Sequence, residues 1–422
     1  MRKICLTVVG MFILLLHAFS QSTPSTSPDD YKSLNLKLEE TNLISNYYSQ
    51  NGNHSAITGG QGSEKLNDVS NIINLKFVKW DILGAKHTLN FELGVDHHTA
   101  ASSAYVSKTG ASKTGGTRVY PSFNWQVENE DKRTTFGLGA SYSSEYTYHS
   151  IGGNILFSKH SKDNNTEFSA TGNIFLDRVK MIEPSELIPQ NTSTGSGQSY
   201  TITSASGRTI TVGAGGQYED IRIPSRSRNT FATSFSLSRV INTRLQASFI
   251  VDAVAQEGYL ALPFHRVYFT DSTAKVENLP SSRFKLPVGM RLNYFAGDNL
   301  IIRSYYRYYT DNWGISSHTA SIELPVKITP FVSVSPFYRY YTQTAAKYFA
   351  PIYGHNLGDA YFTSNYEYSA FNSNYEGINF RVAPPNGVFG AKSISMLEIR
   401  VGHYTQTTGL HANNISLNLR FK

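Results

Sequence analysis

Basic side chains recur at alternate positions in several segments of the C-terminal half of the chain. In residues 300–312, for example, Arg303 and Arg307 share their parity with Tyr305 and Tyr309. If these segments are β-strands, residues of one parity point to one face. The ten basic residues expected on that face are Arg283, Lys285, Arg291, Arg303, Arg307, Lys327, Arg339, Arg381, Arg400 and Arg420, against the acidic residues Glu323 and Glu398. A face this basic would attract anionic solutes to any water-filled space that it lined.

Acidic side chains follow the same alternation in the N-terminal half. Glu92 and Asp96 are on the polar face of one expected strand, and Glu128, Glu167 and Asp177 are on the polar faces of later strands. In a closed sheet, one wall would then be basic and the facing wall acidic, which would select polar solutes over apolar ones. The alternative is structural, with the arginines pairing with tyrosine hydroxyls and carboxylates across the interior and filling it.

Asp96 and three histidines, two of them directly following it in sequence, have the chemistry of metal ligands. Asp96, His97 and His98 are adjacent, and His54 precedes them in a long expected loop. Imidazole and carboxylate groups bind several divalent ions. Adjacent histidines on a strand point to opposite faces, however, so at most one joins a given site. We therefore expect solvated histidines at the rim of the sheet and no metal site.

Serine and histidine residues on neighbouring segments raise the question of hydrolysis. His318 and His403 fall on the apolar faces of their expected strands, and Ser316 and Ser317 are close to His318. A serine hydrolase needs a serine, a histidine and an acid or amide that face one another. The pattern does not bring such a set together, so we expect no catalytic residue and no cofactor, with lipid hydrolysis as a minor alternative.

Period-two alternation runs through the whole chain and specifies the elements that carry these residues. In 283–294, Phe284, Leu286 and Met290 alternate with Arg283 and other polar residues, and 88–96 and 410–422 show the same pattern. Such segments exceed the ~5–6 residues of typical soluble strands and approach the ~9–11 that cross a membrane in a tilted barrel. We expect sixteen strands (between fourteen and eighteen) at 33–49, 69–80, 86–97, 117–128, 133–145, 151–159, 166–180, 228–240, 244–258, 283–296, 300–312, 315–328, 331–345, 374–384, 393–405 and 411–421.

The connections between these segments alternate in length. Segments 50–68, 98–116, 181–227, 259–282 and 346–373 are long, whereas 81–85, 129–132, 160–165, 241–243, 297–299, 329–330 and 385–392 are short. Long loops at one rim and short turns at the other are typical of outer-membrane barrels. The sequence therefore predicts an all-β fold, a transmembrane antiparallel up-and-down β-barrel.

The N-terminal residues predict export. A basic start, an apolar run over 4–16 and small residues before position 21 are typical of a signal peptide, which we place at 1–20. Residues 21–32 then form a short flexible lead-in, and 33–422 a single barrel domain. The only cysteine, Cys5, lies in the signal, which excludes thiol chemistry from the mature chain. Export also argues against nucleic acid as a partner, despite the net charge of +7.

Several aromatic-rich stretches carry a resemblance to a known family. RFKLPVGMRLNYF (283–295), YYRYYTDNWGISSHTASIELPVKITPF (305–331) and FYRYYTQTAAKYFAPIY (337–353) resemble the bacterial domain-of-unknown-function family 3570, and so do YYSQNGNHSAITGG (47–60) and MIEPSELIP (181–189). The resemblance implies an outer-membrane barrel-like protein of Gram-negative bacteria, of the Bacteroidota type. It implies no substrate and no catalytic residue.

These patterns together lead to one main functional expectation and one alternative. We expect a porin-like barrel in the outer membrane, surrounded by lipid, that passes small polar and mainly anionic solutes passively. The alternative is a non-conducting barrel that serves as a structural component or presents its loops to a periplasmic or surface protein. The longest connection, 181–227, is the best place for such a partner or for a segment that closes the pore.

Overall fold

The computed structural model describes residues 33–99, 115–184, 187, 200–203, 209–212 and 218–422. The signal peptide and lead-in predicted at 1–20 and 21–32 lie outside these residues. In the described part of the chain, no helix has the length and apolar character needed to cross a membrane.

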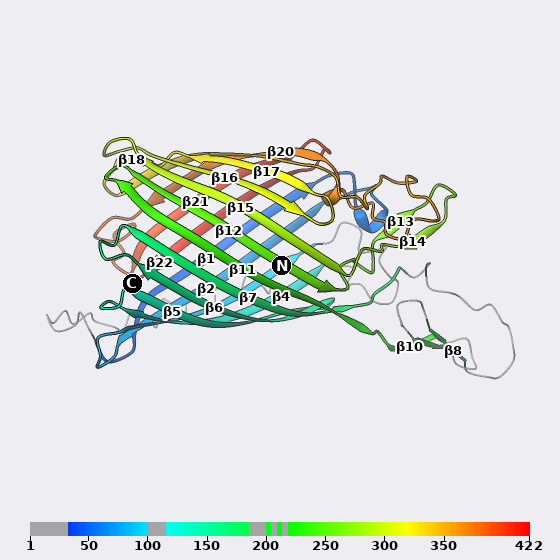
Figure 1. The fold of residues 1–422 in the computed structure, drawn as a ribbon, viewed down its shortest axis with the longest axis horizontal. Coiled ribbons are helices and arrows are strands. Elements are labelled where there is room, and N and C mark those ends of the chain that lie inside the picture. Colours follow the sequence, from blue (N-terminus) through cyan, green and yellow to red (C-terminus); the bar gives the residue numbers. More distant parts are fainter. Residues whose placement is uncertain (1–32, 100–114, 185–186, 188–199, 204–208, 213–217) are drawn as a thin grey trace.

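A closed antiparallel barrel dominates the molecule (Figure 1). Apart from one interrupted strand, each strand pairs with the next along the chain, and the first strand pairs with the last over eleven residue pairs from Thr41↔Phe421 to Asn51↔His411. The barrel strands are β1 (Lys37–Asn51), β2 (Leu66–Trp80), β3 (Lys86–His98), β4 (Gly116–Asn129), β5 (Thr134–Glu145), β6 (Tyr148–His160), β7 (Thr166–Lys180), β11 (Ser225–Asn242), β12 (Leu245–Gly258), β15 (Ser282–Phe295), β16 (Ile301–Asp311), β17 (Ser316–Glu323), β18 (Val326–Thr329), β19 (Val332–Gln343), β20 (Phe371–Val382), β21 (Ile394–Gln406) and β22 (His411–Phe421). Since β17 and β18 both pair with β19 and form one interrupted strand, the predicted sixteen-strand barrel is confirmed.

The interruption between β17 and β18 corrects one predicted strand. The sequence pattern predicted an unbroken strand over 315–328, but Leu324 and Pro325 belong to neither strand. Proline has no backbone N–H to donate to the ladder. The Leu324 N–H still donates to the Pro336 carbonyl oxygen at 2.9 Å, so the two halves continue in the same direction.

Connections of unequal length occupy the two ends of the barrel. The long segments 52–65, 99–115, 181–224, 259–281 and 344–370 connect strands at one end. Figure 1 shows their small elements β8 (Tyr200–Thr203), β10 (Tyr218–Arg222), β13 (Arg266–Tyr268) and β14 (Ala274–Val276) beyond that end, and the C-terminus at the other end. β9 (Thr209–Val212) lies between β8 and β10 in a three-stranded sheet. These five long segments match the predicted long loops, and we call this the long-loop end.

Three long segments pack together into a cap at the long-loop end. Val267, Phe269 and Phe362 form a buried cluster that joins segments 259–281 and 344–370. The Arg266 guanidinium donates to the Ile57 carbonyl oxygen at 2.6 Å, which connects segment 52–65 to them. The η2 helix (Ala56–Thr58) lies against β13. We refer to segments 52–65, 259–281 and 344–370 as the cap.

Large apolar side chains cover the outer face of the barrel wall. Phe235 is 48% exposed and Phe284 is 49% exposed, and many other large apolar side chains of the barrel strands are also exposed. In register across β7, β11 and β12, Phe168 lies beside Leu237, and Leu237 beside Phe249. A soluble protein rarely exposes so continuous an apolar surface. The polar residues that alternate with them point to the interior.

Candidate functional site

Four arginine residues surround a small cavity inside the barrel, which we call the arginine cavity. Arg291 of β15, Arg303 of β16, Arg339 of β19 and Arg400 of β21 line a cavity of about 340 Å³. The one carboxylate among the lining residues is Glu323 of β17. Alternation places each arginine on the face opposite to the apolar outer residues. The local charge is therefore strongly positive.

The ion pairs around Glu323 show that this cavity is on the concave side of the sheet. Arg303 Nη1 lies 3.1 Å from Glu323 Oε1, and Arg400 Nη1 lies 3.3 Å from Glu323 Oε2. Two whole strands, β19 and β20, separate the strands of Glu323 and Arg400. Side chains that diverge on a convex surface cannot meet across two strands, so this contact lies in the interior. One carboxylate thus holds two guanidinium groups.

The other two arginines of the cavity lie over aromatic rings. The Arg339 guanidinium is 5.0 Å from the Tyr375 ring centroid, and that of Arg291 is 5.7 Å from the Tyr305 ring centroid. Cation–π contacts hold a guanidinium in place without neutralising its charge. No ion pair of Arg291 or Arg339 with a carboxylate occurs among the described residues. These two charges remain available to a solute.

A second cavity, of about 410 Å³, lies beside Arg283 and Arg307. Arg283 Nε donates to Asp311 Oδ2 at 2.9 Å, and its guanidinium lies 4.4 Å from the Trp313 ring centroid. Arg307 Nη2 lies 3.7 Å from Asp252 Oδ2. Both arginines are therefore paired with carboxylates. Their contribution to the positive charge of the interior is smaller than that of Arg291 and Arg339.

The remaining residues of the predicted basic and acidic sets are dispersed along the barrel. Arg420 Nε lies 3.3 Å from Glu40 Oε1. Arg381 Nε contacts Met396 Sδ at 3.2 Å. Four more are placed by register: Lys285 lies opposite Asp311, Lys327 opposite Ser333, Glu398 opposite Arg381, and Glu92 opposite Asn74.

The predicted rim histidines and Asp96 have separate partners. Asp96 accepts from Arg118 Nε at 3.0 Å and from the Tyr120 hydroxyl at 2.7 Å. His98 Nε2 lies 3.5 Å from Glu145 Oε1, and the His54 ring stacks on Tyr366 at 3.8 Å. Within the described residues, no three His, Cys, Asp or Glu side chains form a group that could hold a metal ion.

His318 and His403 are hydrogen-bonded to groups other than serine. The Tyr306 hydroxyl and His318 Nδ1 are 2.7 Å apart, and His403 Nδ1 is 2.7 Å from Asn413 Oδ1. Both histidines lie on the outer face, in register with outward neighbours. These contacts do not resemble the relay of a serine hydrolase.

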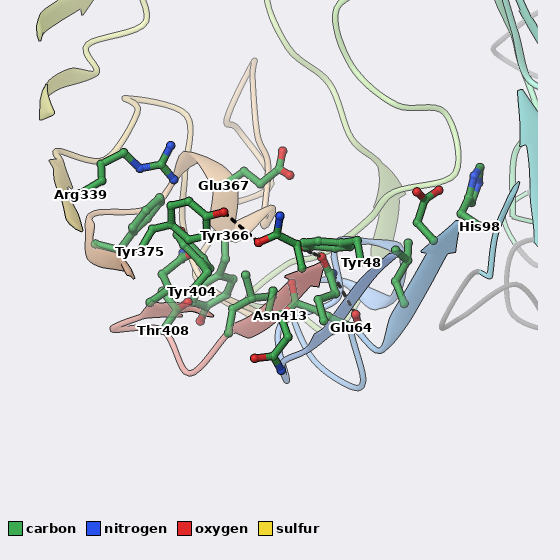
Figure 2. Close-up of a pocket in the computed structure, with 18 of the residues that line it drawn as sticks. Tyr48, Glu64, His98, Arg339, Tyr366, Glu367, Tyr375, Tyr404, Thr408 and Asn413 are labelled. Atoms are coloured by element: carbon green, nitrogen blue, oxygen red, sulfur yellow. Dashed lines mark hydrogen bonds between the residues drawn. The ribbon is translucent and has the colours of Figure 1, made fainter. Parts of the chain in front are cut away.

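A third cavity, of about 1000 Å³, opens at the long-loop end. Figure 2 shows Arg339 and Tyr375 at one end of it and His98 at the other, with Glu367 and Glu64 between them. Arg339 and Tyr375 also line the arginine cavity, so the two spaces adjoin. We call this third cavity the mouth cavity. Its rim residue Glu64 has a pKa raised by burial, although the His54 backbone N–H, which donates to it at 3.1 Å, opposes that rise.

Sequence reasoning missed two sets of residues that shape this interior. Asp311 and Asp252 pair with predicted basic residues but were not counted among the acidic ones. Asp311 has the parity of Arg307 and Tyr309, so alternation alone identifies its face. The tyrosine and glutamine pairs that line the mouth cavity and the second cavity were also missed, and the signal for them is the Tyr-Ser/Thr-Gln tripeptide at 48–50, 341–343 and 404–406.

Comparisons with known proteins give one family and several solved barrels. A family model described as "Protein of unknown function (DUF3570)" matches residues 82–413. A comparison with curated proteins gives no match. OprD from Pseudomonas aeruginosa is 9% identical, with 93% of this chain and 95% of that chain covered and a TM-score of 0.43. OccD3 from the same organism is 8% identical, with 96% and 97% covered and a TM-score of 0.42.

A third solved structure, CdiB from Acinetobacter baumannii, is larger than this chain. It is 9% identical, with a TM-score of 0.44, and the match covers 91% of this chain and 60% of CdiB. The chain thus spans less than two thirds of that protein. The barrel fold itself rests on the strand pairing described above.

Proposed function

The chain belongs to the family described as "Protein of unknown function (DUF3570)", and we propose, from its interior, that it is a passive outer-membrane channel for small polar solutes with a preference for anions. The observation that carries this proposal is the cavity with four arginines and one carboxylate. A barrel of sixteen strands can enclose water. Guanidinium groups bind carboxylate and phosphate oxygens in paired hydrogen bonds. Small organic acids and oxyanions are therefore the solutes that we expect to pass.

Placement in the outer membrane is supported by the outer face of the barrel. Closed barrels leave no sheet edge exposed, which is a requirement for strands in lipid. Apolar side chains such as Phe235 and Phe284 cover the outer face and would contact acyl chains. Tyrosines such as Tyr306 and Tyr338 are exposed on the same face, as is typical of rings near the lipid headgroups.

Measurement of ion selectivity in planar bilayers tests the proposal. With potassium chloride at unequal concentrations on the two sides, we expect a stable conductance whose reversal potential reports chloride preference. The double variant R291Q/R339Q removes two charges that lack a carboxylate partner. We expect the anion-to-cation permeability ratio to fall about threefold or more, because the local potential attracts fewer anions.

A matched charge removal controls for nonspecific effects. Lys132 is exposed in the short turn between β4 and β5, and it lines none of the three cavities. The K132Q variant should keep the selectivity of the wild type. Cation preference in the wild-type protein, or an equal loss in K132Q, would contradict the assignment of selectivity to the arginine cavity.

The cap favours a second candidate function, in which a non-conducting barrel presents its loops to a partner protein. Segments 52–65, 259–281 and 344–370 are folded against one another, and Tyr353, Leu357 and Tyr361 are exposed on them. A folded surface with exposed aromatic residues suits protein binding. Absence of any conductance from correctly folded protein would favour this function over the channel.

A further inference from the structure

A tripeptide that occurs three times places tyrosine and glutamine side chains side by side near the long-loop end. The copies in β1 and β21 line the mouth cavity, and the copy in β19 lines the second cavity, beside Arg283 and Arg307. Tyr-Ser-Gln ends at position 50, and Tyr-Thr-Gln ends at positions 343 and 406. All three are at the ends of their strands, β1, β19 and β21, nearest the long-loop end. Positions i and i+2 of a strand lie on the same face. The tyrosine and the glutamine of each tripeptide therefore point to the interior together.

Each tyrosine orients the glutamine that follows it. The tyrosine hydroxyl donates to the glutamine Oε1 at 2.8 Å in β1, at 2.6 Å in β19 and at 2.9 Å in β21. A fourth pair crosses strands, where the Tyr375 hydroxyl donates to Asn414 Oδ1 at 2.8 Å. With its oxygen occupied, each amide has its NH₂ group left to donate. The arrangement fixes the direction of these donors.

Two of the three glutamines use their NH₂ group to hold the cap. Gln50 Nε2 donates to the Glu64 carbonyl oxygen at 2.9 Å. Gln343 Nε2 donates to the Glu367 carbonyl oxygen at 2.9 Å and to that of Ser369 at 2.6 Å. Gln406 differs, because the turn after β21 is short, and no acceptor for its NH₂ group occurs among the described residues. Gln406 and Tyr404 both line the mouth cavity.

The mouth cavity thus combines aromatic rings with oriented amide groups. Tyr48, Tyr366, Tyr375 and Tyr404 line it together with Gln406 and Asn414. The C–H face of a sugar ring packs on an aromatic ring, while its hydroxyls both donate and accept hydrogen bonds. An apolar solute would leave the amide donors without acceptors, at a cost in free energy. A cavity of about 1000 Å³ has room for several sugar rings.

The carboxylates of the cavity do not form a cation site. Glu64 accepts from the His54 backbone N–H, and within the described residues no three His, Cys, Asp or Glu side chains form a group that could hold a metal ion. Asp68 lines the cavity near His98 rather than near Glu367. Dispersed carboxylates can accept from individual sugar hydroxyls, whereas a bound cation needs several of them converging at one point.

We propose that the mouth cavity is a saccharide-binding vestibule, in which Tyr404 provides the stacking ring and Gln406 an oriented hydrogen-bond donor. This goes beyond the proposed function, because binding at the mouth does not require conduction through the arginine cavity. A sugar bound here lies next to Arg339, which adjoins both cavities. Saccharides would be held at the mouth before any passage.

Calorimetry on the folded full-length protein in detergent tests the vestibule without reference to conductance. The probes are four neutral trisaccharides, namely maltotriose, cellotriose, mannotriose and chitotriose, with polyethylene glycol of similar mass as a non-saccharide control. We expect at least one trisaccharide to bind and polyethylene glycol not to bind. The variants Y404L and Q406A should each weaken that binding about tenfold or more, since each removes one recognition element.

Matched variants separate recognition from folding. Y340L makes the same substitution on the outer face of β19, where Tyr340 is exposed, and should leave the affinity unchanged. Y404F retains the ring but loses the hydroxyl that orients Gln406, so it should fall between wild type and Y404L. Binding of none of the four trisaccharides, equal binding of polyethylene glycol, or an equal loss in Y340L would overturn the proposal. If the protein binds a trisaccharide but shows no conductance, the vestibule proposal would be supported and the channel proposal contradicted.

Discussion

A single buried carboxylate, Glu277, connects two segments of the cap. Its Oε2 accepts from the Leu262 N–H at 2.8 Å, and its Oε1 accepts from the Thr363 hydroxyl at 2.5 Å. His265 Nδ1 lies 3.6 Å from the same Oε1. Burial by itself raises the pKa of Glu277, but the charge of His265 and the hydrogen bonds to the carboxylate outweigh it, and the pKa is lowered.

This shift predicts that acid loosens the cap. A carboxyl whose pKa is lower in the folded state stabilises the fold above its unfolded value, near pH 4.3, and loses that contribution as the pH falls through the folded pKa. The protection of the Asn278 and Phe362 amides from hydrogen exchange, relative to the intrinsic rate at the same pH, should fall below about pH 4, because these amides are paired across the two segments. E277Q should loosen the cap at neutral pH by about 1–3 kcal/mol and show much less further change on acidification.

Asp271 provides the control for this prediction. It lies in the same segment of the cap, and the Thr273 hydroxyl and N–H, which donate to it, lower its pKa. It makes no contact with Glu277 or His265 among the described residues. D271N should therefore keep the protection of Asn278 and Phe362 at neutral pH. If E277Q and D271N exchange alike, the cap does not depend on the buried carboxylate.

At the scale of the element, the ends of β1 and β19 determine how the cap is attached. The glutamine at each strand end donates to the backbone of a cap segment, and a tyrosine two residues earlier fixes its direction. A hydrogen bond of this kind contributes about 0.5–1.5 kcal/mol. The strand end, rather than the loop itself, thus sets the position of residues 64 and 367–369.

Substitution of Gln343 tests this attachment. Q343A removes the donor to Glu367 and Ser369, so hydrogen exchange in the η4 helix (Tyr366–Tyr368) and at Ser369 should accelerate about three- to tenfold. Q406A makes the same change at the equivalent position of β21, where the amide holds no cap segment. Exchange in residues 366–369 should remain at the wild-type rate in Q406A, and a similar acceleration in both variants would refute the attachment.

Most strands could be predicted from alternation, because each has one apolar and one polar face. The predicted 411–421 agrees with β22 (His411–Phe421), and 166–180 agrees with β7 (Thr166–Lys180). The short strands β8, β9, β10, β13 and β14 were not predicted. Strands of three to five residues are too short for a period to be recognised, and their pairing depends on segments distant in sequence.

The candidate site was less predictable than the strands. Parity assigns a face to each arginine, but it does not give the height along the barrel or the partner across the interior. Arg400 and Glu323 are separated by 77 positions, and only closure of the barrel brings them together. Asp252 and Arg307 meet in the same way, from strands that are not adjacent. The balance of charge in the interior therefore requires the three-dimensional structure.

At the scale of the whole molecule, the proposed placement in lipid makes the two faces of one strand respond differently to the same substitution. Phe235 is on the outer face near the middle of β11, and Ser236 is next to it on the inner face, where its hydroxyl lies 2.8 Å from that of Ser169. F235R would place a charge among acyl chains, at a cost of about 2–4 kcal/mol near the midplane. S236R would place the same charge in water.

Unfolding by denaturant in lipid vesicles measures this difference. We expect F235R to lower the free energy of unfolding by about 2–4 kcal/mol relative to wild type, and S236R to lower it by less than about 1 kcal/mol. On a barrel surrounded by water, the order would be reversed, because F235R would then replace an exposed apolar residue by a soluble one. Equal stability of F235R and wild type in vesicles would therefore contradict the membrane placement. The channel and the vestibule are both proposed for a barrel in a membrane, so both proposals would then have to be revised.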